Sequence, residues 1–191
     1  MIEYSKAKYP GLRVAWDVAD AMNLQYGDAS FDCVAEQFGI MFCKDKLTAL
    51  RETYRVLRHD GLFIFSAWDK LEKNPVMHLC DLVMPEFFPV DTPDFFKIPY
   101  SYNNTDAMYK DLQAAGFRDI EIENVLLNGE RIKAADAAAG IAMGTPMYNT
   151  IMNKAPELLQ KIRERYEAII RENLGDEFEA SLSAFVVTAK K

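Results

Sequence analysis

The clearest hydrophobic pattern in the chain is a pair of apolar runs with a helical stretch between them. Residues 30–36 form a short apolar run after a turn, and residues 62–68 are apolar at nearly every position, as expected of buried strands. Residues 45–58 carry a stripe of inward positions at helical spacing, namely Leu47, Leu50, Tyr54 and Leu57. Asp45 is suited to cap this helix. The order predicts a right-handed βαβ unit, which binds ligands beyond the carboxyl ends of its strands.

The rest of the pattern predicts further helices and strands, most of them bounded by glycine or proline. Helices are expected at residues 1–9, 105–115, 133–143 and 156–174, and strands at residues 12–18, within 117–127 and at 184–189. The length of 191 residues fits a single domain over residues 1–191.

Residues 71–104 differ from the rest of the chain because they combine prolines with aromatic residues. The prolines are Pro75, Pro85, Pro89, Pro93 and Pro99, and the aromatic residues are Phe87, Phe88, Phe95, Phe96, Tyr100 and Tyr102. This composition predicts mostly irregular structure with a short helix over residues 77–84. Two interpretations are open: an aromatic flap over a site, since long ordered loops are often functional, or a satellite core beneath a long loop.

Charge and composition exclude several classes of function. A net charge of −7 argues against binding to nucleic acid or to anionic lipid, and no apolar run is long enough to cross a membrane. Cys33, Cys43 and Cys80 lack the spacing of metal ligands, and only two histidines are present, so no metal site is expected. An odd number of cysteines without a secretion signal is typical of reduced thiols in a cytoplasmic protein.

Three segments between Val14 and Trp68 resemble the class I S-adenosylmethionine-dependent methyltransferases, of the type 11-like kind. Asp20-Ala21, shortly before Ser30-Phe31-Asp32, is similar to the acidic loop and fourth strand of that family. The segment ETYRVLRHDG at 52–61 resembles its E-x-x-R-V-L-+-P-G-G motif, and 63–68 its fifth strand. The segment EQFGIMFC at 36–43 is similar to the C-Q-F-G-V-M-F-F type of one bacterial subgroup, which Asn74-Pro75 and the aromatic segment also fit.

This resemblance implies an α/β fold with an incomplete Rossmann-like sheet. The sheet is expected to be mostly parallel with an antiparallel C-terminal strand, and to have helices on both faces. The family begins with a strand, a glycine-rich loop, a helix and a second strand that ends in a ribose-binding acid. Residues 1–7 are similar to the helix that follows, so the chain is expected to be N-terminally truncated. His59-Asp60 replaces the usual basic-Pro turn, and Glu36 stands where the subgroup has a small residue.

Such a truncation has a physical cost. The strand at Val14 would have no neighbour, and the strand at Cys33-Val34 would become an open edge, where each buried unpaired backbone group costs about 1–3 kcal/mol. We therefore expect one of three outcomes. The missing strands come from another chain, the sheet rearranges or pairs edge to edge in a homo-oligomer, or the chain is a fragment that barely folds alone.

The resemblance also implies site residues, each with a structural alternative. Asp20, Ala21 and Met22 would contact the adenine of S-adenosylmethionine, although Asp20 also suits a polar turn. Glu36, Gln37 and Phe38 would line the methionine end, or else pack at the strand end. A hydrophobic acceptor pocket is expected from Phe38, Met41, Trp68, Phe88, Phe96 and Tyr100, whose alternative role is core packing.

Two functions follow from these observations. The first is a methyltransferase acting on a small aromatic or lipophilic molecule, for which only Glu36 and His78 are candidate catalytic bases. Losing the glycine loop, the helix N-terminus and the ribose-binding acid would together weaken cofactor affinity about a thousandfold or more. The second is a non-catalytic methyltransferase-like protein that binds partners or copies of itself through its open sheet edge.

Overall fold

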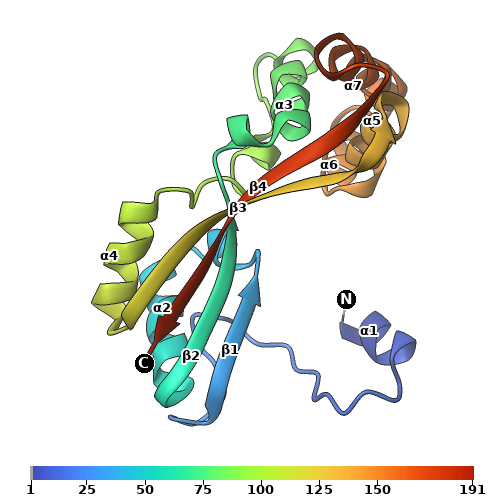
Figure 1. Cartoon of the computed structure of the whole chain (residues 1–191). Helices are drawn as coiled ribbons and strands as arrows, with labels where there is room; N and C mark the ends of the chain where they lie inside the picture. The colour runs from blue at the N-terminus through green and yellow to red at the C-terminus, as the bar shows by residue number, and fades with distance from the viewer. Residues whose placement is uncertain (1) are drawn as a thin grey trace.

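The computed structural model describes residues 2–191 as one twisted sheet with two groups of helices (Figure 1). The helices are α1 (Ile2–Lys8), α2 (Lys46–Val56), α3 (Pro75–Phe87), α4 (Thr105–Ala115), α5 (Ala134–Gly144), α6 (Met147–Lys154) and α7 (Leu159–Leu174). The strands are β1 (Phe31–Gln37), β2 (Leu57–Trp68), β3 (Arg118–Lys133) and β4 (Glu177–Lys190). No helix between residues 2 and 191 has the length and apolar character needed to cross a bilayer.

The sheet has the strand order β1-β2-β4-β3. β1 and β2 are parallel, whereas β4 is antiparallel to both of its neighbours, β2 and β3. β1, β2 and β3 therefore run in one direction and β4 runs against them. The expected α/β fold with an antiparallel C-terminal strand is confirmed, although only one of the neighbouring strand pairs is itself parallel.

The first core lies between one face of the sheet and the helices α2 and α4, which Figure 1 shows on the same side. Alternate residues of β2 point into it, so that Phe63, Phe65 and Ala67 are buried while their neighbours are half-buried. Asp45 caps α2 as expected, because its Oδ1 accepts a hydrogen bond from the Thr48 amide at 3.0 Å. The predicted βαβ unit is confirmed.

A second core forms where β3 and β4 extend beyond the rest of the sheet. Their pairing continues to Lys133 and Glu177, and α3, α5, α6 and α7 gather around this end (Figure 1). α3 is longer than the predicted short helix, and α6 was not predicted. Much of the segment 71–104 belongs to this core, with Cys80, Val83, Met84 and Phe96 buried there. This burial supports the satellite-core interpretation for that part of the segment.

The strand predicted at residues 12–18 is wrong. These residues form no strand, and Leu12, Val14 and Val18 are 55%, 49% and 85% exposed. A strand needs a neighbour to pair its backbone groups, and no described strand lies beside this segment. α1 forms where a helix was expected, but none of its described residues is buried, and Met1 lies outside the described residues.

The other face of β1 and β2 is less covered than the face under α2 and α4. Cys33, Ala35 and Gln37 are exposed on β1, and they pair in register with Leu62, Ile64 and Ser66, which are half-buried. The second layer of helices that we expected is not seen over these two strands within residues 2–191. β1 is also an edge strand, so its outer backbone groups have no strand partner in that range.

Gly116 offers a test of the first core. It ends α4 with φ of 106°, and a Cβ there would lie 3.0 Å from the ring of Tyr54. We expect Gly116→Ala to lower the free energy of unfolding by about 1–3 kcal/mol, because alanine is strained at this φ and would displace the ring. Urea denaturation measures the change. Gly144→Ala is the control, because no atom lies within 4 Å of its added Cβ; an equal loss in both variants would contradict the argument.

Candidate functional site

The carboxyl ends of β1 and β2 bring three of the predicted aromatic residues together. Phe38 directly follows β1 with φ of 53°, and its amide donates to the Ser66 carbonyl at 3.2 Å. Its ring stacks on Trp68 with a centroid distance of 4.1 Å, and Trp68 lies 5.9 Å from the ring of Tyr100. Burial raises the pKa of Tyr100 to about 12, so its hydroxyl keeps its proton at neutral pH. The site thus has an aromatic wall.

The other predicted pocket residues lie elsewhere. Met41 is buried in the first core, 3% exposed, among Ile40 and Tyr102. Phe88 and Phe96 pack in the second core and not with Phe38 and Trp68. For these two residues the core-packing alternative describes their surroundings, because the fold directs the segment after α3 toward α5–α7.

Glu36 is the most unusual polar residue at this end of the sheet. It points to the same face as Phe65, its register partner, and burial raises the pKa of its carboxyl to about 7. Within residues 2–191 the carboxyl group of Glu36 takes part in no hydrogen bond. A Cβ on Gly39 would lie 2.7 Å from its Oε1, so a larger residue at position 39 would make the carboxyl group move.

Three residues that sequence analysis did not select surround Glu36. Burial and the charges of Glu36 and Asp20 raise the pKa of the Cys43 thiol, while Lys46 lowers it. The Lys46 ammonium donates to the Cys43 carbonyl at 3.3 Å and lies 5.4 Å from the ring centre of Tyr102. Cys43 and Lys46 follow Glu36 closely in sequence and could have been found there. Tyr102 comes from the aromatic segment 71–104, which sequence analysis considered as a flap over a site, but it was not selected as a site residue.

The loop with Asp20 turns back on itself and lies near this group. The Asp20 Oδ1 accepts a hydrogen bond from the Met22 amide at 2.9 Å, which is the polar turn that we considered. The carboxyl group remains exposed, so the turn does not prevent it from accepting a second hydrogen bond. Ala21 and Met22 are half-buried beside it. The charge of Asp20 contributes to the raised pKa of the Cys43 thiol, so the Asp20 carboxylate lies near Cys43.

Glu52 and Arg55 of α2 hold the end of this loop. Glu52 Oε2 accepts a hydrogen bond from the Leu24 amide at 2.8 Å. Arg55 donates to the carbonyls of Leu24 and Tyr26 at 2.9 and 2.8 Å, and to Glu52. These contacts give the E-x-x-R part of the motif a physical role. Glu52 holds one backbone amide of an otherwise exposed loop, and the planar guanidinium of Arg55 holds two of its carbonyls.

His78, the other candidate base, lies on α3 in the second group of helices. Its Nδ1 is buried and has no hydrogen-bond partner within residues 2–191. No contact joins it to Glu36 or to the aromatic wall. In the part of the chain that the structure describes, no three His, Cys, Asp or Glu side chains gather as metal ligands.

Arg55 gives the first test of this site. We expect Arg55→Lys to loosen residues 20–28, because an ammonium cannot replace the guanidinium fork that binds two carbonyls and two carboxylates. Limited proteolysis followed by mass spectrometry should show cleavage in this loop several-fold faster than in the wild type. Arg51→Lys, an exposed position on the same helix, should leave the rate unchanged. Equal rates in the wild type and Arg55→Lys would contradict this role.

Glu36 gives the second test. A carboxyl whose pKa is raised to about 7 in the folded chain favours its protonated form there. Stability from this group is therefore present below its unfolded pKa and is lost as pH rises toward 7. We expect the free energy of unfolding to fall by about 1–2 kcal/mol from about pH 5 to pH 8, discounted because the group is only half-buried.

Urea denaturation across this pH range measures the effect. Glu36→Gln should remove this part of the pH dependence, because the amide does not titrate. Glu130→Gln, an exposed glutamate in β3, is the matched control and should keep the wild-type slope. A wild-type slope that Glu36→Gln leaves unchanged would refute the assignment.

The chain is similar to methyltransferases in sequence. Residues 1–65 match a family model described as a methyltransferase domain. A ubiquinone/menaquinone biosynthesis C-methyltransferase of Bdellovibrio bacteriovorus is 45% identical over 56 residues, which cover 29% of this chain and 24% of that protein. The protein of the same name from Dinoroseobacter shibae is 29% identical over 123 residues, which cover 59% of this chain and 49% of that protein. The chain therefore spans a quarter to a half of the length of these relatives.

The fold agrees with the sequence matches. The phosphoethanolamine N-methyltransferase 2 of Haemonchus contortus, solved in complex with S-adenosyl-L-methionine, matches 98% of this chain and 39% of its own with a TM-score of 0.54 and 16% identity. At that identity the likeness concerns the fold alone. The match over residues 1–65 and the fold are thus both similar to those of S-adenosylmethionine-dependent methyltransferases.

Proposed function

We propose that this chain forms the acceptor side and part of the cofactor side of a methyltransferase that methylates a small aromatic molecule. The observation that carries the proposal is the pairing of an aromatic wall, Phe38, Trp68 and Tyr100, with the half-buried Glu36 at the carboxyl ends of β1 and β2. The relatives named for ubiquinone and menaquinone biosynthesis support a quinol-like ring and transfer to carbon.

The residues present fit part of an S-adenosylmethionine site. The exposed carboxylate of Asp20 is placed to accept a hydrogen bond from an adenine amino group, on a loop that Arg55 holds in place. Glu36, Gln37 and Phe38 would line the methionine end. Residues 2–191 contain no glycine-rich loop before β1, since Gly11 and Gly27 stand alone there. The ribose and carboxylate ends of the cofactor would need groups from elsewhere.

Bound cofactor would supply an activated methyl group, and the protein's residues would do the rest. The aromatic wall orients the acceptor ring and excludes water, which favours an in-line displacement. The ring carbon would take this methyl group, and the sulfur of the cofactor would keep the electron pair of the broken methyl–sulfur bond. Glu36 then accepts the proton that the ring carbon loses. A carboxyl with a pKa of about 7 is suited to this base role near neutral pH.

The uncovered face and edge of β1 support a partner for this function. Cys33, Ala35 and Gln37 are exposed beside an edge without a strand neighbour in the described chain. We propose that a segment carrying the missing strands and glycine-rich loop pairs with this edge. The same exposed edge favours the second candidate function, a non-catalytic protein that assembles through β1.

A measurement of cofactor binding distinguishes the methyltransferase from the non-catalytic protein. The purified chain should first be sized by light scattering and then titrated calorimetrically with S-adenosylmethionine. Micromolar binding is expected if the chain, or an oligomer of it, has a complete cofactor wall. Asp20→Asn should then weaken binding about tenfold to a hundredfold, because a neutral amide loses a charged hydrogen bond but keeps the turn.

Asp32→Asn is the control, because Asp32 lies at the start of β1 and pairs with Arg58 away from this site. It should bind like the wild type. No heat of binding at millimolar cofactor, in every oligomer present, would contradict activity of this chain alone. A cofactor-free oligomer with that result would favour the non-catalytic function.

A further inference from the structure

Four polar side chains from distant parts of the chain meet next to the aromatic wall. They are Asp69 directly after β2, Asn74 directly before α3, Asn124 of β3 and Ser183 of β4, and we call them the polar cluster. Asn74 and Ser183 are only 1% and 3% exposed. None of the four was predicted as a site residue, because the cluster exists only once the strands have paired.

The Asp69 carboxylate is the central acceptor of the polar cluster. Its Oδ2 accepts hydrogen bonds from the Ser183 hydroxyl at 2.8 Å and from the Asn124 side-chain amide at 3.1 Å. Its Oδ1 accepts one from the Lys70 amide at 2.7 Å. The Asp69 backbone amide donates to the Ser183 carbonyl at 3.1 Å. Because hydrogen bonds to a carboxylate are stronger than those between neutral groups, this one residue holds the end of β2 to both β3 and β4.

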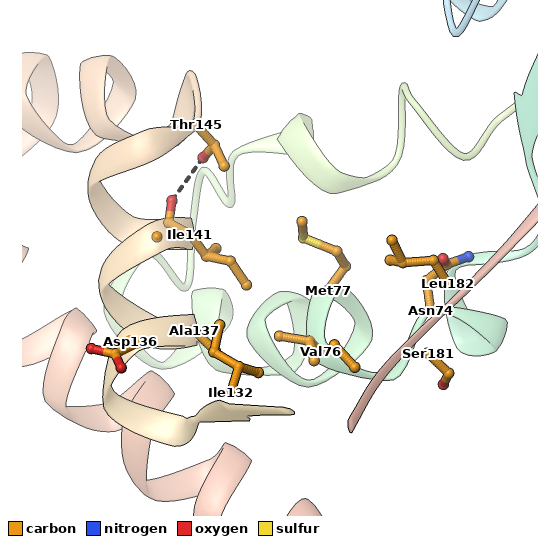
Figure 2. A pocket seen from close by; sticks show the side chains of 12 residues that line it. Asn74, Val76, Met77, Ile132, Asp136, Ala137, Ile141, Thr145, Ser181 and Leu182 are labelled. Carbon is orange, nitrogen blue, oxygen red and sulfur yellow. Dashed lines mark hydrogen bonds between the residues drawn. The ribbon is translucent and has the colours of Figure 1, made fainter. Parts of the chain in front are cut away.

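Asn74 joins the start of α3 to the same point of β4. Its side-chain amide donates to the carbonyls of Ser183 and Lys70 at 3.1 and 3.2 Å, and its oxygen accepts from the Ser183 amide at 3.1 Å. Asn74 also borders an apolar pocket of about 260 Å³ around Met77, and Figure 2 shows Asn74 and Leu182 at one end of it. Atoms beside a cavity lack packing partners on that side, so polar contacts fix the start of α3 here.

The polar cluster adjoins Trp68 of the aromatic wall. Trp68 is the last residue of β2 and pairs in register with Ala184 of β4. Asp69 follows Trp68 and binds Ser183, the neighbour of Ala184, so the cluster closes this strand pair immediately beyond Trp68. The backbone of Trp68 is therefore held on both sides while its ring stacks on Phe38 at a centroid distance of 4.1 Å.

From this geometry we infer that Asp69 is a positioning residue, which holds the Trp68 ring against Phe38 through the polar cluster. A simple role in the turn after β2 accounts for the bond to the Lys70 amide but not for the bonds to Asn124 and Ser183. For the position of the ring, the inference rests on these hydrogen bonds alone. It rests on the proposed function for the consequence that a displaced Trp68 ring binds an aromatic acceptor less tightly.

An exchange of carboxylate and amide tests the hydrogen bonds without changing the size of the side chains. In Asp69→Asn the new amide nitrogen faces either the Asn124 side-chain nitrogen or the Lys70 amide, so two donors meet in both orientations. The double variant Asp69→Asn/Asn124→Asp places an acceptor opposite each donor again, including the Ser183 hydroxyl. Asp106→Asn, at an exposed position of α4, is the matched control.

The position of the Trp68 ring is measured by ¹⁹F NMR without cofactor or acceptor. The chain has two tryptophans, so 5-fluorotryptophan in a Trp16→Phe background labels Trp68 alone. Phe38→Leu in this background gives the signal of the unstacked ring. Asp69→Asn should move the signal most of the way to that position, and the added Asn124→Asp should return it. Asp106→Asn should leave it in place.

Two results would overturn the positioning role. One is an unmoved signal in Asp69→Asn, and the other is a displacement that the double variant does not reverse. Ser183→Ala keeps the test decisive if Asp69→Asn does not fold, because it removes only one donor to the carboxylate. It should move the signal part of the way in the same direction, and an unmoved signal there would count equally against the role.

The consequence for the acceptor is tested with 1-naphthol, an aromatic probe that needs no cofactor, by following the same ¹⁹F signal. We expect saturable binding to the Trp16→Phe chain, affinity about fivefold to fiftyfold weaker in Asp69→Asn, and recovery in the double variant. Equal affinities in the Trp16→Phe chain and Asp69→Asn would overturn this consequence. If 1-naphthol binds to none of the variants while the free chains show the expected signals, the proposed function is contradicted and the positioning of Trp68 by Asp69 stands.

Discussion

The backbone pairing of β4 is the constraint on which the rest of the structure depends. β4 pairs with β2 from Leu62 to Trp68 and with β3 along most of its length. Its inner half contributes Phe185, Val187 and Ala189 to the first core, and its outer half contributes Phe178 to the second. Both groups of helices are therefore anchored to one strand.

The same strand explains how two sites become neighbours. Ala184 lies opposite Trp68, and Leu182, two residues earlier in β4, lines an apolar pocket together with residues of α3 and α5. Asn74 pairs with both backbone groups of Ser183 between them, and fixes the start of α3 to β4. Because buried and fully paired amides are costly to displace, this contact sets the position of α3 relative to the aromatic wall.

Local periodicity was enough to predict the βαβ unit, the cap at Asp45 and most helices. It failed at residues 12–18, where an alternating pattern has no partner strand in the described chain, and strand formation depends on such a partner. It also missed α6 and the full length of β3 and β4, because residues 126–131 of β3 are exposed and carry no alternating hydrophobic pattern. The antiparallel direction of β4 was expected from family resemblance and not from periodicity.

The residues of the candidate site also fall into those that the sequence could predict and those that it could not. Glu36, Phe38 and Trp68 follow strands in the βαβ unit, so sequence analysis could place them at one end of the sheet. Tyr102 and the pocket around Met77 depend on contacts between distant segments, which no spacing reveals. Phe88 and Phe96 show the reverse error, since aromatic character alone did not indicate which core would bury them.

The position of β4 has a consequence for the order in which the protein is made. β4 is the last described element to leave the ribosome. β2 and β3, which pair with it on either side, are synthesised before it. Until then β2 and β3 are two separate edges with apolar faces, and such surfaces are prone to aggregate. Until residues 177–190 emerge, the nascent chain therefore carries two strand edges without their shared partner.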